Sequence, residues 1–126
     1  MSNKDCYCGS GKMFDACCSP YIHNVVKAPS AAVLMRSRYS AYCTGAADYL
    51  VATTHTSTRK FHRKEDILEW SKSNQWLKLE VLKATETVVE FKAYFLDSRL
   101  KATVHHEKSS FVKEDGDWFY VDGIFY

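Results

Sequence analysis

Four cysteines that fall within thirteen residues constrain the fold of this chain more than any other feature. Cys6 and Cys8 are separated by one residue, and after eight further residues Cys17 and Cys18 are adjacent. A zinc ion takes four thiolates at tetrahedral corners about 2.3 Å away, and two such pairs can supply them if the chain turns sharply between the pairs. The alternative is a set of disulfides, which would have to cross-link these cysteines within a very small loop. We therefore predict one structural zinc ion that is held by four sulfurs and has no open coordination site.

The residues between the two pairs have the composition of a tight turn. Gly9, Ser10 and Gly11 follow the first pair directly. Glycine tolerates positive φ and a close approach of backbone to sulfur, and the Ser10 hydroxyl can hydrogen-bond a thiolate. Residues 13–16 can then form one helical turn that returns the second pair to the metal. A module this small has little core of its own, so we expect Phe14 and Tyr21 to pack it onto the main domain.

The segment from Cys6 to Cys18 resembles the SEC-C motif, a zinc-binding segment also found at the C-terminus of the SecA translocation ATPase. In that family the last ligand is Cys or His, so the resemblance implies Cys18 as the fourth ligand, with His23 as a reserve. SEC-C motifs of the translocase family contact a chaperone and the ribosome, which implies a protein partner of a similar class here. We expect such a partner to contact a surface formed by Tyr7, Lys12, Met13, Phe14 and Tyr21.

Length and composition leave room for one further domain. The chain has 126 residues, of which 46% are hydrophobic and 25% charged, as in an ordinary globular protein. No apolar run approaches the roughly 18 residues of a membrane span, and the N-terminus is polar, so we expect a cytoplasmic protein that does not enter a membrane. Four thiolates and one divalent ion would cancel the formal charge of +2, so the net charge does not favour a nucleic-acid partner. A basic cluster at residues 59–64 is followed at once by acidic residues, which favours a solvated helix start over a polyanion site.

The hydrophobic pattern changes from a helical period to a strand period near Asn74. Spacings of three and four predict helices over residues 30–43, 48–54 and 65–73, and Gly45 ends the first of them. Alternation then predicts strands over 77–81, 89–95, 100–113 and 118–126, the last two joined by a turn at Asp115 and Gly116. Helices followed by antiparallel strands indicate an α+β fold in which the helices cover one face of a curved sheet.

A wider resemblance covers nearly the whole chain. The run from Leu34 to Tyr42, His55, and the residues from His106 to Ser109 and from Trp118 to Gly123 look like the YchJ family. That family joins a SEC-C motif to a cone-shaped domain with the fold of nuclear transport factor two, also called cystatin-like, and its biochemical role is not established. The resemblance implies a zinc-binding motif over residues 1–24 and the cone-shaped domain over residues 25–126. Some members carry a second SEC-C motif after this domain.

A cone-shaped sheet with a helix across its mouth leaves room for a pocket, and several polar residues are candidates for its lining. These residues are Arg36, Arg38, Tyr39, His55, Glu107, Tyr120 and Asp122. If the protein is an enzyme, we expect His55 or Asp122 to act as the base, with Arg38, Tyr39 and Glu107 orienting a polar substrate. The alternative is structural: one of the two arginines pairs with Glu107 or Asp122 inside the domain, and the tyrosines belong to the core. Alternation alone leaves open which face of the third strand is interior.

Three functions are compatible with these features. We favour a zinc-binding protein that acts as a protein-interaction or scaffold module through its cysteine segment. The alternative is a small-molecule-binding protein or a small enzyme that uses the pocket of the cone. A third possibility is an assembly role in which aromatic residues near the C-terminus form a homodimer. Cys43 lies in a predicted helix and is expected to be a buried apolar residue instead of a reactive thiol.

Overall fold

The computed structural model describes residues 5–126, so the first four residues of the predicted 1–24 motif lie outside the described part of the chain. The helical elements come first, as the change of period predicts. They are η1 (Phe14–Ala16), α1 (Ser19–Ile22), α2 (Ala31–Thr44), α3 (Ala47–Ala52), η2 (Arg59–Phe61) and α4 (Lys64–Ser73). The strands come after them and are β1 (Gln75–Ala84), β2 (Val88–Leu96), β3 (Ala102–Glu114) and β4 (Asp117–Phe125).

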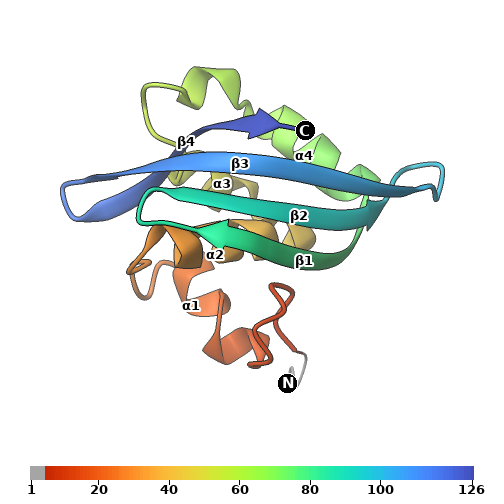
Figure 1. Cartoon of the computed structure of the whole chain (residues 1–126), viewed down its shortest axis with the longest axis horizontal. Helices are drawn as coiled ribbons and strands as arrows, with labels where there is room; N and C mark the ends of the chain where they lie inside the picture. The colour runs from red at the N-terminus through yellow and green to blue at the C-terminus, as the bar shows by residue number, and fades with distance from the viewer. Residues whose placement is uncertain (1–4) are drawn as a thin grey trace.

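The four strands form one antiparallel sheet in the order β1-β2-β3-β4. Figure 1 shows helices α2, α3 and α4 lying against one face of this sheet, with the N-terminal segment beyond β1 at the edge of the molecule. The α+β fold and the helices on one side of the sheet are thus confirmed. No helix in the described part of the chain combines the length and the apolar character that crossing a bilayer requires.

Helix α2 is the central element, and its two ends follow the signals in the sequence. The Ser30 hydroxyl accepts a hydrogen bond from the Val33 backbone N–H at 3.2 Å, which caps the first turn. At the other end Gly45 has φ of 75°, and its N–H bonds to the Ala41 carbonyl, which ends the helix. Between these caps Leu34 and Met35 are buried against the sheet. One side of α2 therefore forms the core with β2, β3 and β4.

Three irregularities interrupt the strand pairing of the sheet, at Leu77 and Leu82 of β1 and at Val121 of β4. In β1, Trp76 pairs with Phe95 and Lys78 with Tyr94, so Leu77 has no partner on β2. Such a bulge inserts one residue and reverses the facing of the residues beyond it in the strand. Trp76 is the residue that faces the core, whereas Leu77 is 57% exposed, although the alternation of Leu77, Leu79 and Val81 with polar residues predicts that Leu77 faces inward.

The third irregularity lies between β3 and β4. Phe111 pairs with Tyr120 and Ser110 with Asp122, which leaves Val121 as the extra residue. Tyr120 is buried and Asp122 is exposed, although strict alternation places both on one face. At the same point the Tyr120 N–H donates to the Thr53 carbonyl and the His55 N–H donates to the Tyr120 carbonyl. The end of α3 thus holds the bulge in place and turns Tyr120 inward.

Candidate functional site

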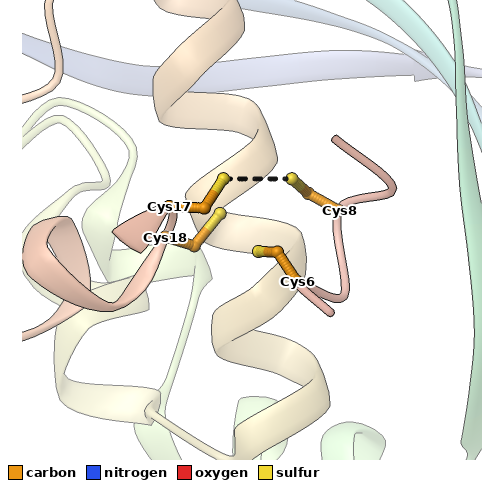
Figure 2. A group of neighbouring side chains, drawn as sticks. All are labelled: Cys6, Cys8, Cys17 and Cys18. Carbon is orange, nitrogen blue, oxygen red and sulfur yellow. Dashed lines mark hydrogen bonds between the residues drawn. The ribbon is translucent and has the colours of Figure 1, made fainter. Parts of the chain in front are cut away.

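The cysteine cluster, formed by Cys6, Cys8, Cys17 and Cys18, is the first of two candidate sites. Its four sulfur atoms all lie within 4.8 Å of one another, and Figure 2 shows the side chains pointing toward a common centre. A regular tetrahedron of sulfurs around a zinc ion at about 2.3 Å has edges of about 3.8 Å. The distance from Cys8 Sγ to Cys17 Sγ is 3.7 Å, and all five cysteines lie in the described part of the chain as free thiols. The residues present therefore fit a four-coordinate metal ion.

The loop between the two pairs supports the cluster as its composition predicts. Gly9 and Gly11 have φ of 78° and 83°, and Ser10 Oγ lies 3.2 Å from Cys17 Sγ. The one-turn helix η1 then returns the chain to Cys17 and Cys18. His23, the reserve ligand, instead contacts Ser19 through Nδ1 and is not part of the group.

The sulfurs compete for protons within this small volume. A hydrogen bond from Cys18 is the main cause that lowers the pKa of Cys8 to about 4, and the same interaction raises the pKa of Cys18. Burial raises the pKa of Cys17. Metal ligands must be thiolates, so an ion at the centre would displace the protons that these groups share.

The cluster is attached to helix α2 by polar contacts. Arg36 Nη1 donates to the Cys8 carbonyl at 2.8 Å, and Cys6 Sγ lies 3.6 Å from Ser40 Oγ. Phe14 and Ile22 pack on the buried cysteines together with Leu79 of β1. Arg36 therefore supports the cysteine cluster and does not line the pocket, for which it was a candidate.

An interior pocket of about 290 Å³ is the second candidate site. It lies between helix α2, helix α4 and the sheet, and its aromatic wall includes Trp70, Trp76 and Phe91. Four of the seven candidate residues line it, namely Arg38, Tyr39, Glu107 and Tyr120. Aromatic walls with a few convergent polar groups are typical of sites that bind small molecules.

The other candidates are elsewhere. His55 contacts Glu114 through Nε2 at 2.5 Å and Ser57 through Nδ1 at 2.8 Å, and its ring lies against Phe119 of β4. Asp122 is exposed because the same bulge turns it away from the core. His55 and Asp122 were the two candidates for a catalytic base, and neither of them lies in the pocket with Arg38, Tyr39 and Glu107.

Glu107 is the buried carboxylate of the pocket, and its position answers which face of β3 is interior. Its side chain is held by three hydrogen bonds, one each from His105 at 2.7 Å, Ser109 at 2.7 Å and Tyr120 at 2.8 Å. Burial alone would raise the pKa of Glu107, but these hydrogen bonds outweigh it and hold the pKa below its ordinary value. Because an ionised carboxylate only accepts, His105 Nε2 carries the proton of that bond.

The ion pair that was predicted between Arg36 or Arg38 and a buried carboxylate is not formed in the described residues. Within residues 5–126 no carboxylate lies at ion-pair distance from Arg38 or Arg36. Arg38 Nη1 instead donates to the Leu50 carbonyl at 2.9 Å and to Thr53 Oγ1 at 2.6 Å. The guanidinium lies over the ring of Tyr120, 4.6 Å from its centroid. Buried positive charge is thus stabilised by oxygen dipoles and an aromatic face.

Sequence reasoning missed His62, which also lines the pocket. Its ring contacts Tyr120 edge-on, and neither ring nitrogen has a hydrogen-bond partner among the described residues. Burial, together with the nearby charge of Arg38, lowers the pKa of His62. The residue follows η2 in an irregular segment, so no hydrophobic period points to it, and the basic residues around it indicate only a charged surface.

Replacing Glu107 with glutamine is expected to make the protein less sensitive to acid than the wild type. A carboxylate whose folded pKa is depressed contributes stability above its ordinary pKa of 4.5, and this contribution is lost as the pH falls through the folded value. The wild type should therefore lose more of its melting temperature than Glu107→Gln between pH 6 and pH 3, a range chosen to span about 1.5 units on each side of 4.5. Thermal melts of both proteins across this range test the point, and parallel pH profiles would contradict it.

Comparison with known proteins places the chain in a family. Residues 30–123 match the family model described as "YchJ, middle NTF2-like domain". The chain belongs to the YchJ family. A UPF0225 protein of Photorhabdus laumondii is 41% identical in an alignment 126 positions long, which covers 94% of this chain and 79% of that relative. The resemblance noted in the sequence is therefore confirmed.

Two solved structures extend the likeness to the N-terminal segment. A SEC-C motif containing protein from Rhodopseudomonas palustris superimposes with a TM-score of 0.88 at 36% identity, covering 96% of this chain and 98% of its own. One from Psychrobacter arcticus has a TM-score of 0.80 at 27% identity and covers 96% and 82%. The likeness to SEC-C motif proteins thus covers the N-terminal cysteine segment as well as the NTF2-like domain, while the boundary between residues 24 and 25 stays a prediction.

Proposed function

We propose that this protein binds a small molecule in the interior pocket and that the cysteine cluster holds one structural zinc ion. The observation that carries the proposal is the lined pocket itself: an aromatic wall surrounds the same space as the buried side chains of Arg38 and Glu107 and the half-buried His62. If side chains filled this space and the polar groups were paired to one another, the domain would have no room for a ligand there. The proposal concerns binding and assigns no reaction.

Four sulfur ligands with tetrahedral spacing favour zinc over the hard cations, which prefer oxygen. Because the protein supplies all four ligands, no coordination position is left for a substrate or a water molecule. A closed site of this kind favours a structural ion over a catalytic one. Such an ion would hold the two cysteine pairs together, and the contacts of Arg36 and Ser40 would hold the resulting knuckle on helix α2.

This proposal changes the order of the functions that the sequence favours. Lys12 and Met13 are exposed and remain a hypothetical contact surface for a protein partner, whereas Phe14 is half-buried against the cysteine cluster. A side chain that packs the knuckle is a poor anchor for another protein, because exposing it would weaken the metal site. A partner, a cytoplasmic location and a homodimer all stay predictions.

Filling the pocket tests the proposed function. Ala93 is 3% exposed and lines the pocket from β2, so Ala93→Trp would place an indole in the cavity. We expect small aromatic fragments to shift the indole N–H resonances of Trp70 and Trp76 in the wild type and not in the filled variant. Ala102→Trp makes the same change at an exposed position of the neighbouring strand and should leave binding intact.

Two results would contradict the proposal. Fragments that shift these resonances equally in wild type and Ala93→Trp would bind elsewhere, and a broad fragment set that shifts neither indole would show a closed interior. If Ala93→Trp fails to fold, Ala93→Leu supplies a smaller obstruction and should weaken binding in proportion to the volume it removes.

A further inference from the structure

The guanidinium of Arg38 uses only part of its hydrogen-bonding capacity within the protein. An arginine side chain has five N–H donors, two on each terminal nitrogen and one on Nε. Every hydrogen bond that Arg38 makes in the described residues comes from Nη1, whose acceptors are the Leu50 carbonyl and the hydroxyls of Thr53 and Thr54. The two donors on Nη2 and the one on Nε have no protein acceptor there.

These remaining donors lie in reach of solvent although the residue is only 7% exposed. Among the described residues, Trp118 Nε1 is the one fully buried side-chain nitrogen or oxygen atom that lacks a hydrogen-bond partner. Arg38 Nε and Nη2 have no partner either, so they cannot be fully enclosed. Arg38 lines the interior pocket, so the pocket is the space in which a ligand can reach these donors.

Contacts within the protein fix the orientation of the guanidinium edge that carries Nε and Nη2, before any ligand binds. Nη1 is held by the end of α3, and the flat face of the guanidinium rests on the Tyr120 ring. The edge that carries Nε and Nη2 presents two parallel N–H groups, the arrangement that matches a carboxylate. Holding this edge in place without a ligand lowers the entropy that binding must lose.

The buried carboxylate of the pocket does not occupy this edge. Glu107 Oε1 accepts from His105, and Oε2 accepts from Ser109 and Tyr120. Glu107 is also a negative charge in the same cavity, so it opposes a dianion such as a phosphate more strongly than a monoanion. Burial keeps His62 from adding positive charge, because it lowers the pKa of that imidazole.

We infer that the ligand of the interior pocket is a small aromatic or flat apolar carboxylic acid, whose carboxylate binds Nε and Nη2 of Arg38. This inference rests on the proposed function and names the ligand class for the same site. The body of the acid packs against Trp70, Trp76 and Phe91, which line the cavity. Buried ionic hydrogen bonds with this geometry are strong because water does not compete with them.

Matched pairs of probes test the charge requirement in the wild-type protein. Benzoate and naphthalene-2-carboxylate are each compared with their carboxamides, which keep the shape and lose the charge. We expect the carboxylates to bind about ten- to hundredfold more tightly, the effect of two charge-assisted hydrogen bonds. In NMR spectra the Arg38 Nε–H resonance should move downfield with the carboxylates and stay in place with the carboxamides.

Arg38→Lys and Arg36→Lys form the matched pair of variants. Lysine keeps the positive charge but lacks the two parallel N–H donors of a guanidinium, so Arg38→Lys should lose most of the preference for carboxylates. Arg36 lies on the same helix and bonds to the Cys8 carbonyl outside the pocket, so Arg36→Lys should keep the preference. The wild-type comparison stands by itself if Arg38→Lys does not fold.

The possible results separate the two proposals. If carboxylates and carboxamides shift Trp70 and Trp76 with equal affinity, the carboxylate inference is wrong and the pocket remains a binding site. If Arg38→Lys keeps the full preference, another group binds the charge and the inference is also wrong. If neither probe of either pair reaches the pocket, the carboxylate inference is wrong, and the broad fragment set alone decides whether the proposed function fails with it.

Discussion

Replacing Cys18 with serine is expected to abolish stoichiometric metal binding and to release the N-terminal segment from helix α2. Cys18 is 1% exposed and lies among the other three sulfurs, and in residues 5–126 no other His, Cys, Asp or Glu belongs to this group. Structural zinc sites in small modules contribute apparent binding free energies of about 10–16 kcal/mol, and removing one thiolate from four loses a large part of this. Elemental analysis should show about one ion per chain in the wild type and close to none in Cys18→Ser.

Cys43→Ser is the matched control for this loss. Cys43 lies outside the cysteine cluster, and burial raises the pKa of its thiol to about 12, so it remains protonated. The variant should keep its metal. Hydrogen exchange adds a second measurement: the amide of Cys6, which donates to the Lys12 carbonyl, should lose protection in Cys18→Ser, whereas amides of β2 and β3 should not. A full complement of metal in Cys18→Ser would contradict the assigned ligand set.

Adding a single methyl group at Gly123 is expected to destabilise the domain by about 3 kcal/mol, the sum of overpacking and of weakened buried hydrogen bonds. A Cβ at this position would overlap the Glu107 carboxylate and lie 2.6 Å from its Cδ and 2.8 Å from its Cγ. Glu107 cannot retreat without leaving its partners His105, Ser109 and Tyr120. In thermal melts of Gly123→Ala the melting temperature should fall by roughly 10 °C.

A double variant shows whether the clash is the cause. Glu107→Ala removes the atoms that the new methyl group meets, so the two substitutions together should cost clearly less than the sum of the single effects. Asp122→Ala is the control on the same strand, because this neighbouring side chain is exposed and should change stability little. Additive effects of Glu107→Ala and Gly123→Ala would show that the strain lies in the backbone and not at the carboxylate.

Local signals in the sequence predicted much of the fold. The ends of helix α2 follow Ser30 and Gly45, whose effects act within one helical turn. The cysteine cluster is equally local, because eight residues separate its two pairs and two glycines form the turn. The strands and their order follow from period-two runs joined by short connections.

The pocket could be predicted only in part, because its lining depends on contacts between distant segments. The bulge at Val121 turns Asp122 outward, and no residue type at that position signals the slip. Arg38 donates to the Leu50 carbonyl at the end of α3 and not to a carboxylate. Glu107 has its own partner in His105, which lies on the same strand, β3, as Glu107. His105 and Glu107 are two residues apart in β3, so alternation puts them on one face of the strand, and this spacing is the signal in the sequence for their pairing.

The central claim is that the interior pocket holds a small acid on Arg38, and a crystal structure with naphthalene-2-carboxylate tests it most directly. We expect density for the naphthalene ring between Trp76 and Phe91, with the carboxylate oxygens at hydrogen-bond distance from Nε and Nη2 of Arg38. A pocket that contains only protein side chains, or a probe whose carboxylate points away from Arg38 into solvent, would contradict the claim.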